Sequence, residues 1–204
     1  MTRITRLTHA AACALGLAFL SGTAAIAAED AAGITTSVTP DTLPAKKQTE
    51  PGLYITAAEA AALLETRDDV VLIDVRTPEE TMFVGFPTVA DANIPYLNVD
   101  PAHRHNPERG SYAMTHNPGF VPATLDLLDQ TDARAALVMC RSGGRSASAV
   151  NALAGAGVDV PLYSVVDGFE GDKNEAGKRT VNGWKNAGAP WTAKIPAGFL
   201  HEAD

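Results

Sequence analysis

The chain has 204 residues, of which 46% are hydrophobic and 20% charged, and its formal net charge is −8. This composition is typical of a globular protein that buries a core, and the length suits one domain with a modest extension. The acidic balance argues against nucleic acid as a partner.

The first 28 residues have the pattern of a cleaved secretory signal. Arg3 and Arg6 precede an apolar stretch from Ala10 to Leu20, and small residues then run to Ala28. The apolar stretch is shorter than the about 20 residues that a membrane span needs. We therefore predict a periplasmic or secreted protein with no membrane association after cleavage. Its net charge would fall from −8 to −10, because the signal carries Arg3 and Arg6 and no acid.

Residues 29–52 are polar and interrupted by prolines, which predicts an N-terminal arm or linker ahead of a domain at 53–204. Thr56 and Glu59 form a capping-box pattern at the start of a helix predicted at Ala57–Glu65.

Three continuous apolar runs predict strands that are buried on both faces of a parallel sheet: Val70–Arg76, Ala136–Cys140 and Pro161–Val166. Helices predicted at 121–130 and 146–157 alternate with them. The alternation indicates an α/β fold with a mostly parallel central sheet of about five strands, flanked by helices. Reactive groups in such sheets collect at the carboxyl ends of the strands, and Cys140 stands at one of these ends.

Cys140 is the only cysteine outside the predicted signal, so the mature chain can form no internal disulfide. An isolated cysteine is commonly a small apolar core residue. Here, however, Gly143 and Gly144 follow it and permit a tight turn whose amides converge on one point. Arg141, Arg145 and the N-terminus of the next helix add positive charge, which favours a thiolate.

A cysteine phosphatase or arsenate reductase would use a similar cysteine-to-helix loop, but with a longer spacing between cysteine and arginine. Four residues separate Cys140 from Arg145. The smaller cradle suits a sulfur atom held on the cysteine better than a tetrahedral phosphoryl group, so this alternative ranks last.

The loop "CRSGGRS" at 140–146 resembles the active-site loop of single-domain rhodanese-type sulfurtransferases. Further segments resemble that family in the same order along the chain: "LIDVRTPEE" at 72–80, "ANIPY" at 92–96, "DGFEG" at 167–171 and "GWKNAGAPW" at 183–191. The resemblance spans about Tyr54 to Trp191 and implies the rhodanese-like three-layer α/β fold.

The resemblance also implies an activity. The Cys140 thiolate would take a sulfane sulfur from thiosulfate or a similar small anionic donor and hold it as a persulfide. Because the mature chain has no second thiol, the acceptor must be external: a small thiol, a protein cysteine or cyanide. This chemistry requires no metal and no organic cofactor.

The site residues follow from the same resemblance. The backbone of the loop would hold the persulfide, and the arginines would bind the donor; the substrate-binding set is Arg141, Ser142, Gly143, Gly144, Arg145 and Arg76. Asp74 and Ser146 would give structural support.

Two stretches, 98–120 and 170–183, are longer than a minimal domain of this type needs. If both fold over the carboxyl edge of the sheet, they could form a docking face for a protein partner. This favours a rival interpretation, a sulfur-carrier or partner-binding module with little turnover. His103, His105 and His116 in the first stretch are expected to be solvated rather than metal ligands.

Overall fold

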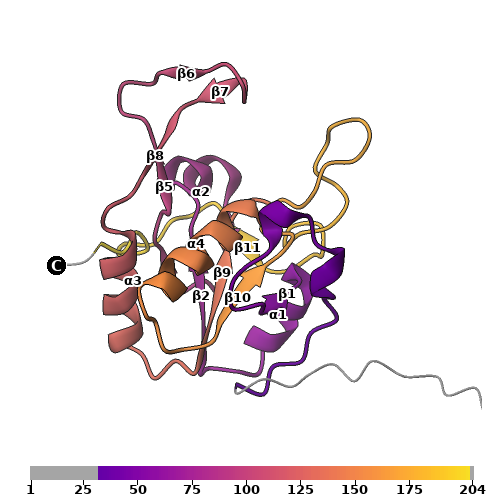
Figure 1. The fold of residues 1–204 in the computed structure, drawn as a ribbon, viewed down its shortest axis with the longest axis vertical. Helices are drawn as coiled ribbons and strands as arrows, with labels where there is room; N and C mark the ends of the chain where they lie inside the picture. The colour runs from indigo at the N-terminus through magenta and orange to yellow at the C-terminus, as the bar shows by residue number, and fades with distance from the viewer. Residues whose placement is uncertain (1–31, 203–204) are drawn as a thin grey trace, which may run out of the picture.

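A five-stranded sheet forms the centre of the computed structural model, which describes residues 32–202 (Figure 1). Its strands follow the order β1-β10-β9-β2-β4, and neighbours in this order pair in parallel. The strands are β1 (Tyr54–Ile55), β2 (Val70–Asp74), β4 (Ala92–Asn93), β9 (Ala135–Met139) and β10 (Leu162–Val165). The predicted signal segment lies outside the described residues.

Helices cover both faces of this sheet. Helix α1 (Ala57–Leu64) packs on one face, and α3 (Phe120–Asp129) and α4 (Gly144–Gly155) pack on the other. The short helix α2 (Pro78–Val84) follows β2 at the carboxyl edge (Figure 1). The protein therefore has a three-layer α/β fold, as the alternation of strands and helices predicts. Within residues 32–202, no helix has the length and apolarity that crossing a membrane requires.

The alternation of side chains along β2 divides the core into two parts. Val70 and Leu72 face α1, whereas Val71 and Ile73 face α3 and α4. Because both faces are covered, β2 and β9 are buried along their whole length. This explains why their sequences are continuously apolar instead of alternating.

The predicted elements are confirmed, with shifts of one or two residues at most ends. In α1, the Glu59 amide donates to Thr56 Oγ1 at 3.2 Å, and the Glu59 carboxylate accepts from the Thr56 amide at 2.9 Å. The strand predicted to reach Arg76 ends at Asp74, which is paired in register with Met139, the last residue of β9. The segments that follow β2 and β9 therefore leave the sheet side by side.

Small antiparallel pairs extend from the central sheet, and the sequence gives no clear pattern for them. Strand β5 (Leu97–Val99) pairs with β8 (Met114–His116), and β6 (His105–Asn106) pairs with β7 (Ser111–Tyr112) farther out. Together they form a long hairpin that rises above the carboxyl edge (Figure 1). Strands β3 (Phe86–Pro87) and β11 (Trp191–Thr192) form a separate pair.

The segment from residue 32 to residue 52 packs against the domain. Ala32 and Ile34 are buried in the core on the α1 side, and Lys47 is 7% exposed. Two 3₁₀ turns follow Ile34, η1 (Pro40–Thr42) and η2 (Ala45–Lys47), and Lys47 is the last residue of the second. From residue 32 on, the predicted arm is thus part of the folded unit and reaches toward the carboxyl edge.

Candidate functional site

Cys140 lies where β9 ends and the loop to α4 begins. The residue is 2% exposed and borders the core on the side of α3 and α4. The Gly143 amide donates to Cys140 Sγ at 3.2 Å, and the Cys140 amide donates to Ser146 Oγ at 2.8 Å. The buried Ser146 hydroxyl therefore holds the start of the loop, a position that suits the supporting role predicted for it.

Gly143 gives the loop its shape. Its backbone has φ 94° and ψ −31°, a conformation that residues other than glycine rarely adopt. A Cβ at this position would lie 2.0 Å from the carbonyl oxygen of Val166. Only glycine can therefore turn the amide toward Sγ while the chain passes this close to Val166.

The segment after β10 closes over the same loop. The Phe169 amide donates to the Cys140 carbonyl at 2.8 Å, and the Glu170 amide donates to the Arg141 carbonyl at 2.9 Å. Gly168 makes this approach possible, since a Cβ there would lie 2.4 Å from the Cys140 carbonyl oxygen. The loop is thus held from both sides, by α4 and by the chain that leads into residues 170–183.

Arg145 pairs with Glu80 on α2. Its two terminal nitrogens, Nη1 and Nη2, each donate to the Glu80 carboxylate at 2.6 Å. Burial would raise the pKa of Glu80, but the hydrogen bonds and the charge of Arg145 outweigh it and hold the pKa below its usual range. Burial would also lower the pKa of Arg145. The hydrogen bonds and the charge of Glu80 outweigh this effect and raise the pKa, and the charges of Cys140 and Asp74 act in the same direction. Arg145 is therefore close to Cys140, yet its charge is balanced.

Glu80→Gln is expected to lower the free energy of unfolding by about 1–2 kcal/mol at neutral pH, because Arg145 loses its carboxylate partner. Since the pKa of Glu80 is lowered in the fold, its contribution is present above the pKa of an unfolded glutamate. It is lost as the pH falls through the lower folded value. Urea unfolding at neutral and acidic pH should show the difference from wild type shrinking on acidification. Glu79→Gln, at an exposed neighbouring position, is the control and should change little.

Arg76 and Asp74 form a buried pair beneath the loop. Both side chains are 0% exposed, and Arg76 Nε donates to Asp74 Oδ1 at 2.9 Å. Arg76 also donates to the Gly85 carbonyl at 2.8 Å, and its guanidinium lies 4.1 Å from the centre of the Phe169 ring. The buried pairing of Asp74 with Arg76 favours the structural role predicted for Asp74. The bonds of Arg76 to Asp74 and to the Gly85 carbonyl favour a structural role over the predicted substrate-binding one, and we assign it a structural role.

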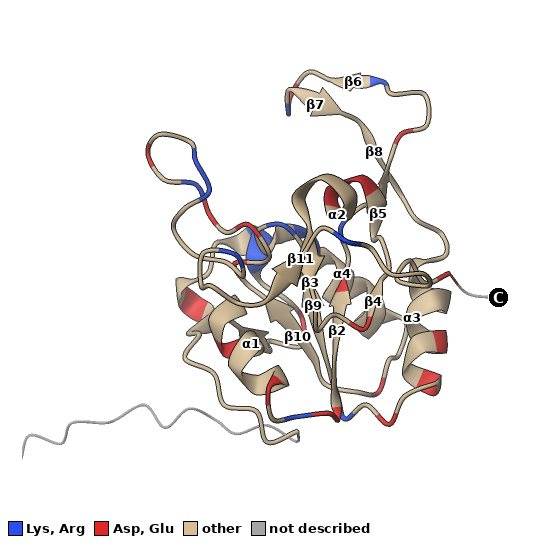
Figure 2. Cartoon of the chain, turned by 180° about the vertical axis from the view of Figure 1, so that it is seen from behind, with Lys and Arg blue, Asp and Glu red and all other residues tan. Residues whose placement is uncertain are grey.

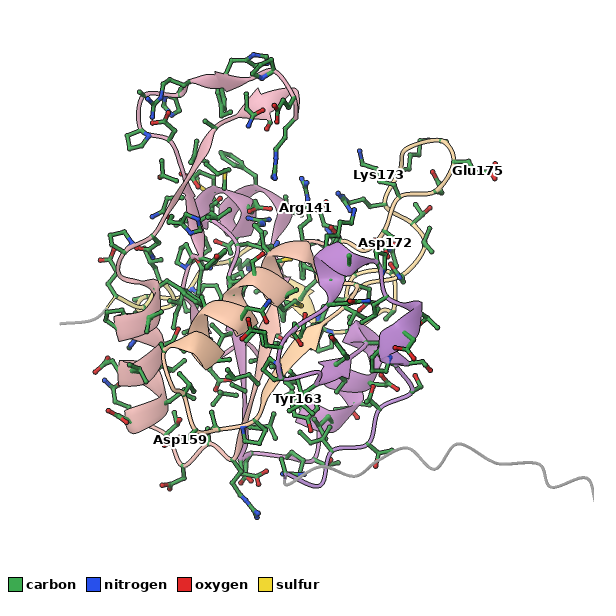
Figure 3. The ribbon with its side chains drawn as sticks, in the orientation of Figure 1. Arg141, Asp159, Tyr163, Asp172, Lys173 and Glu175 are labelled. Atoms are coloured by element: carbon green, nitrogen blue, oxygen red, sulfur yellow. The ribbon has the colours of Figure 1, made fainter. Side chains whose placement is uncertain are left out.

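Arg141 is exposed at the start of the loop, in contrast to the paired Arg145. Figure 3 places it at the carboxyl edge, beside the loop that carries Asp172 and Lys173 and at the opposite end of the molecule from Asp159. Within residues 32–202, no carboxylate lies within ion-pair distance of Arg141. It is therefore the cation of the predicted site that is available to a ligand.

Arg179, on the 170–183 loop, also belongs to this site, although its position in the sequence gives no sign of it. Its guanidinium donates to the Gly171 carbonyl, and the Gly171 amide donates to the Arg141 carbonyl at 3.2 Å. Burial lowers the pKa of Arg179, and repulsion from Arg141 lowers it further, whereas the charges of Glu170, Asp172 and Cys140 act against this shift. Arg179 is thus within electrostatic range of both Arg141 and Cys140.

Both long stretches rise from the carboxyl edge of the sheet (Figure 1). Acidic residues lie along α1 and α3 and on α2 at this edge, and a group of basic residues gathers at the edge beside the 170–183 loop (Figure 2). Two aromatic side chains at this edge are strongly exposed: Phe83 on α2 is 78% exposed, and Tyr112 on the hairpin is 58% exposed. The edge therefore combines the cysteine loop, positive charge and exposed rings.

Two of the three histidines of the hairpin lie beside tyrosines. The ring of His103 lies 5.4 Å from that of Tyr112, and the ring of His116 lies 5.2 Å from that of Tyr96. In the part of the chain that the structure describes, no group of three or more histidine, cysteine or acidic side chains is arranged to hold a metal ion.

No family model matches the sequence. The crystal structure of Rv0390 from M. tuberculosis is 32% identical over 69% of this chain and 96% of its own, with a TM-score of 0.52. The chain belongs to the Rv0390 family. A protein of unknown function from Rhodopseudomonas palustris, RPA3614, described as a possible tyrosine phosphatase, is 22% identical over 69% of this chain and 84% of its own, with a TM-score of 0.40.

Two curated relatives come from Rickettsia. The uncharacterized proteins RP600 of Rickettsia prowazekii and RC0915 of Rickettsia conorii are each 29% identical over 138 residues, which cover 67% of this chain and 94% of theirs. The shared length is shorter than this chain by about a third, so this member of the Rv0390 family carries additional sequence beyond that common part.

Sequence reasoning missed two charged residues of the site, Glu80 and Arg179. A local signal for Glu80 exists: Thr77 and Glu80 repeat the capping-box spacing of α1, with a proline at the first helical position. Recognising it would have predicted α2 and brought Glu80 to the carboxyl edge. Arg179 has no such signal, because only the folded path of the 170–183 loop brings it back to Arg141.

Proposed function

We propose that this protein of the Rv0390 family is a sulfurtransferase that carries a sulfane sulfur on Cys140. The observation that carries the proposal is the Gly143 amide, which donates to Cys140 Sγ at 3.2 Å in a glycine loop at the end of a parallel strand. A core cysteine that only fills space needs no amide aimed at its sulfur. Nor does it need the positive-φ glycine packed against Val166 that this amide requires.

The transfer proceeds in two displacements. The Cys140 thiolate attacks the outer sulfur of thiosulfate, the sulfur–sulfur bond of the donor breaks, and its electron pair leaves with sulfite. Cys140 then holds a persulfide whose terminal sulfur carries the negative charge. A second thiolate, or cyanide, attacks that sulfur, and Cys140 leaves as a thiolate. No proton, oxidant or reductant is consumed in either step.

The surrounding charges support this sequence of steps. Gly143 donates to the reacting sulfur, and Arg141 is free to bind the anionic end of the donor. Arg145 holds the loop through Glu80, which makes it a positioning residue rather than a donor-binding one. The backbone of Ser142 and Gly144 would complete the cradle around the persulfide.

A sulfur carrier with little turnover is the second candidate, and the edge around the loop favours it. Phe83 and Tyr112 are strongly exposed on elements that flank the site, and the hairpin and the 170–183 loop both rise from it (Figure 1). In this form of the proposal, the acceptor is a cysteine of a partner protein that docks on the edge. The periplasm or the exterior is the proposed compartment, where a single unpaired cysteine suits a reactive role.

Intact mass measurement after incubation with thiosulfate tests the proposal. We expect the wild-type protein to gain one sulfur atom and Cys140→Ser to gain none. Cyanide or a small thiol should then remove the added sulfur, with repeated turnover for an enzyme and a single transfer for a carrier.

The control reaction is hydrolysis of an aryl phosphate, which the proposed function does not include. Absence of any mass gain with thiosulfate, polysulfide and mercaptopyruvate would contradict sulfur transfer. Phosphate release that depends on Cys140 would point instead to a phosphatase.

A further inference from the structure

The 170–183 loop is tied down at several points. The Asn174 amide donates to the Lys178 carbonyl at 2.8 Å, which closes the tip of the loop. At its base, Lys47 Nζ donates to both carboxylate oxygens of Asp172 at 2.9 Å, and the Asp172 amide donates to Asn182 Oδ1 at 2.7 Å. These bonds hold the second half of the loop, on which Arg179 lies, against the site.

Arg179 is held beside the cysteine loop by a short chain of hydrogen bonds. Its guanidinium donates to the Gly171 carbonyl, and the amide of the same Gly171 donates to the Arg141 carbonyl. A single residue thus connects the guanidinium of Arg179 with the backbone next to Cys140. Arg179 is half-buried, so its position depends on the loop rather than on solvent contacts.

Three of the basic residues near the site are in ion pairs, whereas Arg141 and Arg179 are not. Arg145 is paired with Glu80, Arg76 with Asp74, and Lys47 with Asp172. Within residues 32–202, no carboxylate lies within ion-pair distance of Arg141 or Arg179. Arginine does not lose its proton in proteins, so both guanidinium groups stay charged. The charges of Glu170 and Asp172 act on Arg179 without an ion pair, and a bound anion would give both arginines a direct partner.

We infer that Arg179 and Arg141 together form a binding site for a doubly charged oxyanion. They bind the donor at its sulfonate end and then hold the sulfite that leaves. The inference rests on the proposed function and adds a specificity-determining residue to it: Arg179, on the 170–183 loop, favours dianionic donors such as thiosulfate over donors with one charge. Two guanidinium groups present several N–H donors to the three oxygens of a sulfonate. The same pair stabilises the charge that develops on sulfite as the sulfur–sulfur bond breaks.

Arg179→Gln tests the assignment, and Lys178→Gln is the matched control, since Lys178 is an exposed neighbour on the same loop. Persulfide formation on Cys140 is followed by mass with thiosulfate and, separately, with a monoanionic alkyl persulfide. We expect Arg179→Gln to raise the thiosulfate KM by roughly tenfold or more and to leave use of the alkyl persulfide within about twofold. Lys178→Gln should match wild type with both donors.

Calorimetric titration with sulfite, and with inorganic phosphate in a parallel arm, gives a readout that does not require turnover. Equal sulfite affinity and equal thiosulfate KM in wild type and Arg179→Gln would overturn the inference while leaving sulfur transfer intact. Sulfite binding that depends on Arg179, in a protein that no donor loads, would support the anion site and contradict the proposed function. Tighter binding of phosphate than of sulfite would overturn the assignment to sulfur oxyanions.

Discussion

Gly143→Ala is expected to destabilise the protein by about 3 kcal/mol or more and to slow persulfide formation at least about a hundredfold. A left-handed backbone alone costs an alanine about 1–2 kcal/mol. At Gly143 the added Cβ would also lie 2.0 Å from the Val166 carbonyl oxygen and 2.7 Å from its carbon, which are backbone atoms that no change of rotamer can move. Relief requires the loop to shift, and the shift removes the amide from Cys140 Sγ.

Urea unfolding measures the first effect, and the rate of mass gain with thiosulfate measures the second. Gly157→Ala is the matched control, because Gly157 has φ 79° but a Cβ there meets no atom within 4 Å. It should lose only the cost of the left-handed backbone, about 1–2 kcal/mol, and keep the rate of loading. Equal stability of the two variants would show that the close approach to Val166 does not hold the loop.

The parts of this fold that local patterns specify are predictable from the sequence. The buried strands β2 and β9 are continuous apolar runs, and α1 begins with a capping box, so each element carries its own signal. The position of Cys140 follows from the same signals, because a strand ends just before it and a helix begins just after it. The glycines that follow predict the tight turn, and Gly143 adopts the positive φ that such a turn requires.

The parts that depend on contacts between distant segments are not predictable in this way. The hairpin strands β6 and β7 are largely exposed, so burial imposes no alternation on their sequences. The pairing of Arg145 with Glu80 joins residues 65 positions apart, and that of Lys47 with Asp172 joins residues 125 positions apart. No local pattern announces such a pair, and for this reason the arginines near Cys140 could not be divided into paired and unpaired ones from the sequence.

Arg76→Met is expected to lower the free energy of unfolding by about 3–5 kcal/mol, because it leaves the carboxylate of Asp74 buried without its partner. Both side chains are 0% exposed, so water cannot replace the lost hydrogen bonds. The variant also loses the bond to the Gly85 carbonyl and the contact with the Phe169 ring. Arg104→Met is the matched control for urea unfolding. Arg104 is 72% exposed, so water can replace its bonds to Asp100, and a much smaller loss than for Arg76→Met is expected.

A double variant separates the charge from the packing. If the cost of Arg76→Met arises mainly from the unpaired carboxylate, then Asp74→Leu combined with Arg76→Met should be clearly more stable than the sum of the two single losses predicts. The kinetic outcome decides between the two roles considered for Arg76. A structural role leaves the thiosulfate KM of the folded Arg76→Lys variant unchanged, because the guanidinium does not reach solvent. A KM raised about tenfold at unchanged stability would instead assign Arg76 to donor binding.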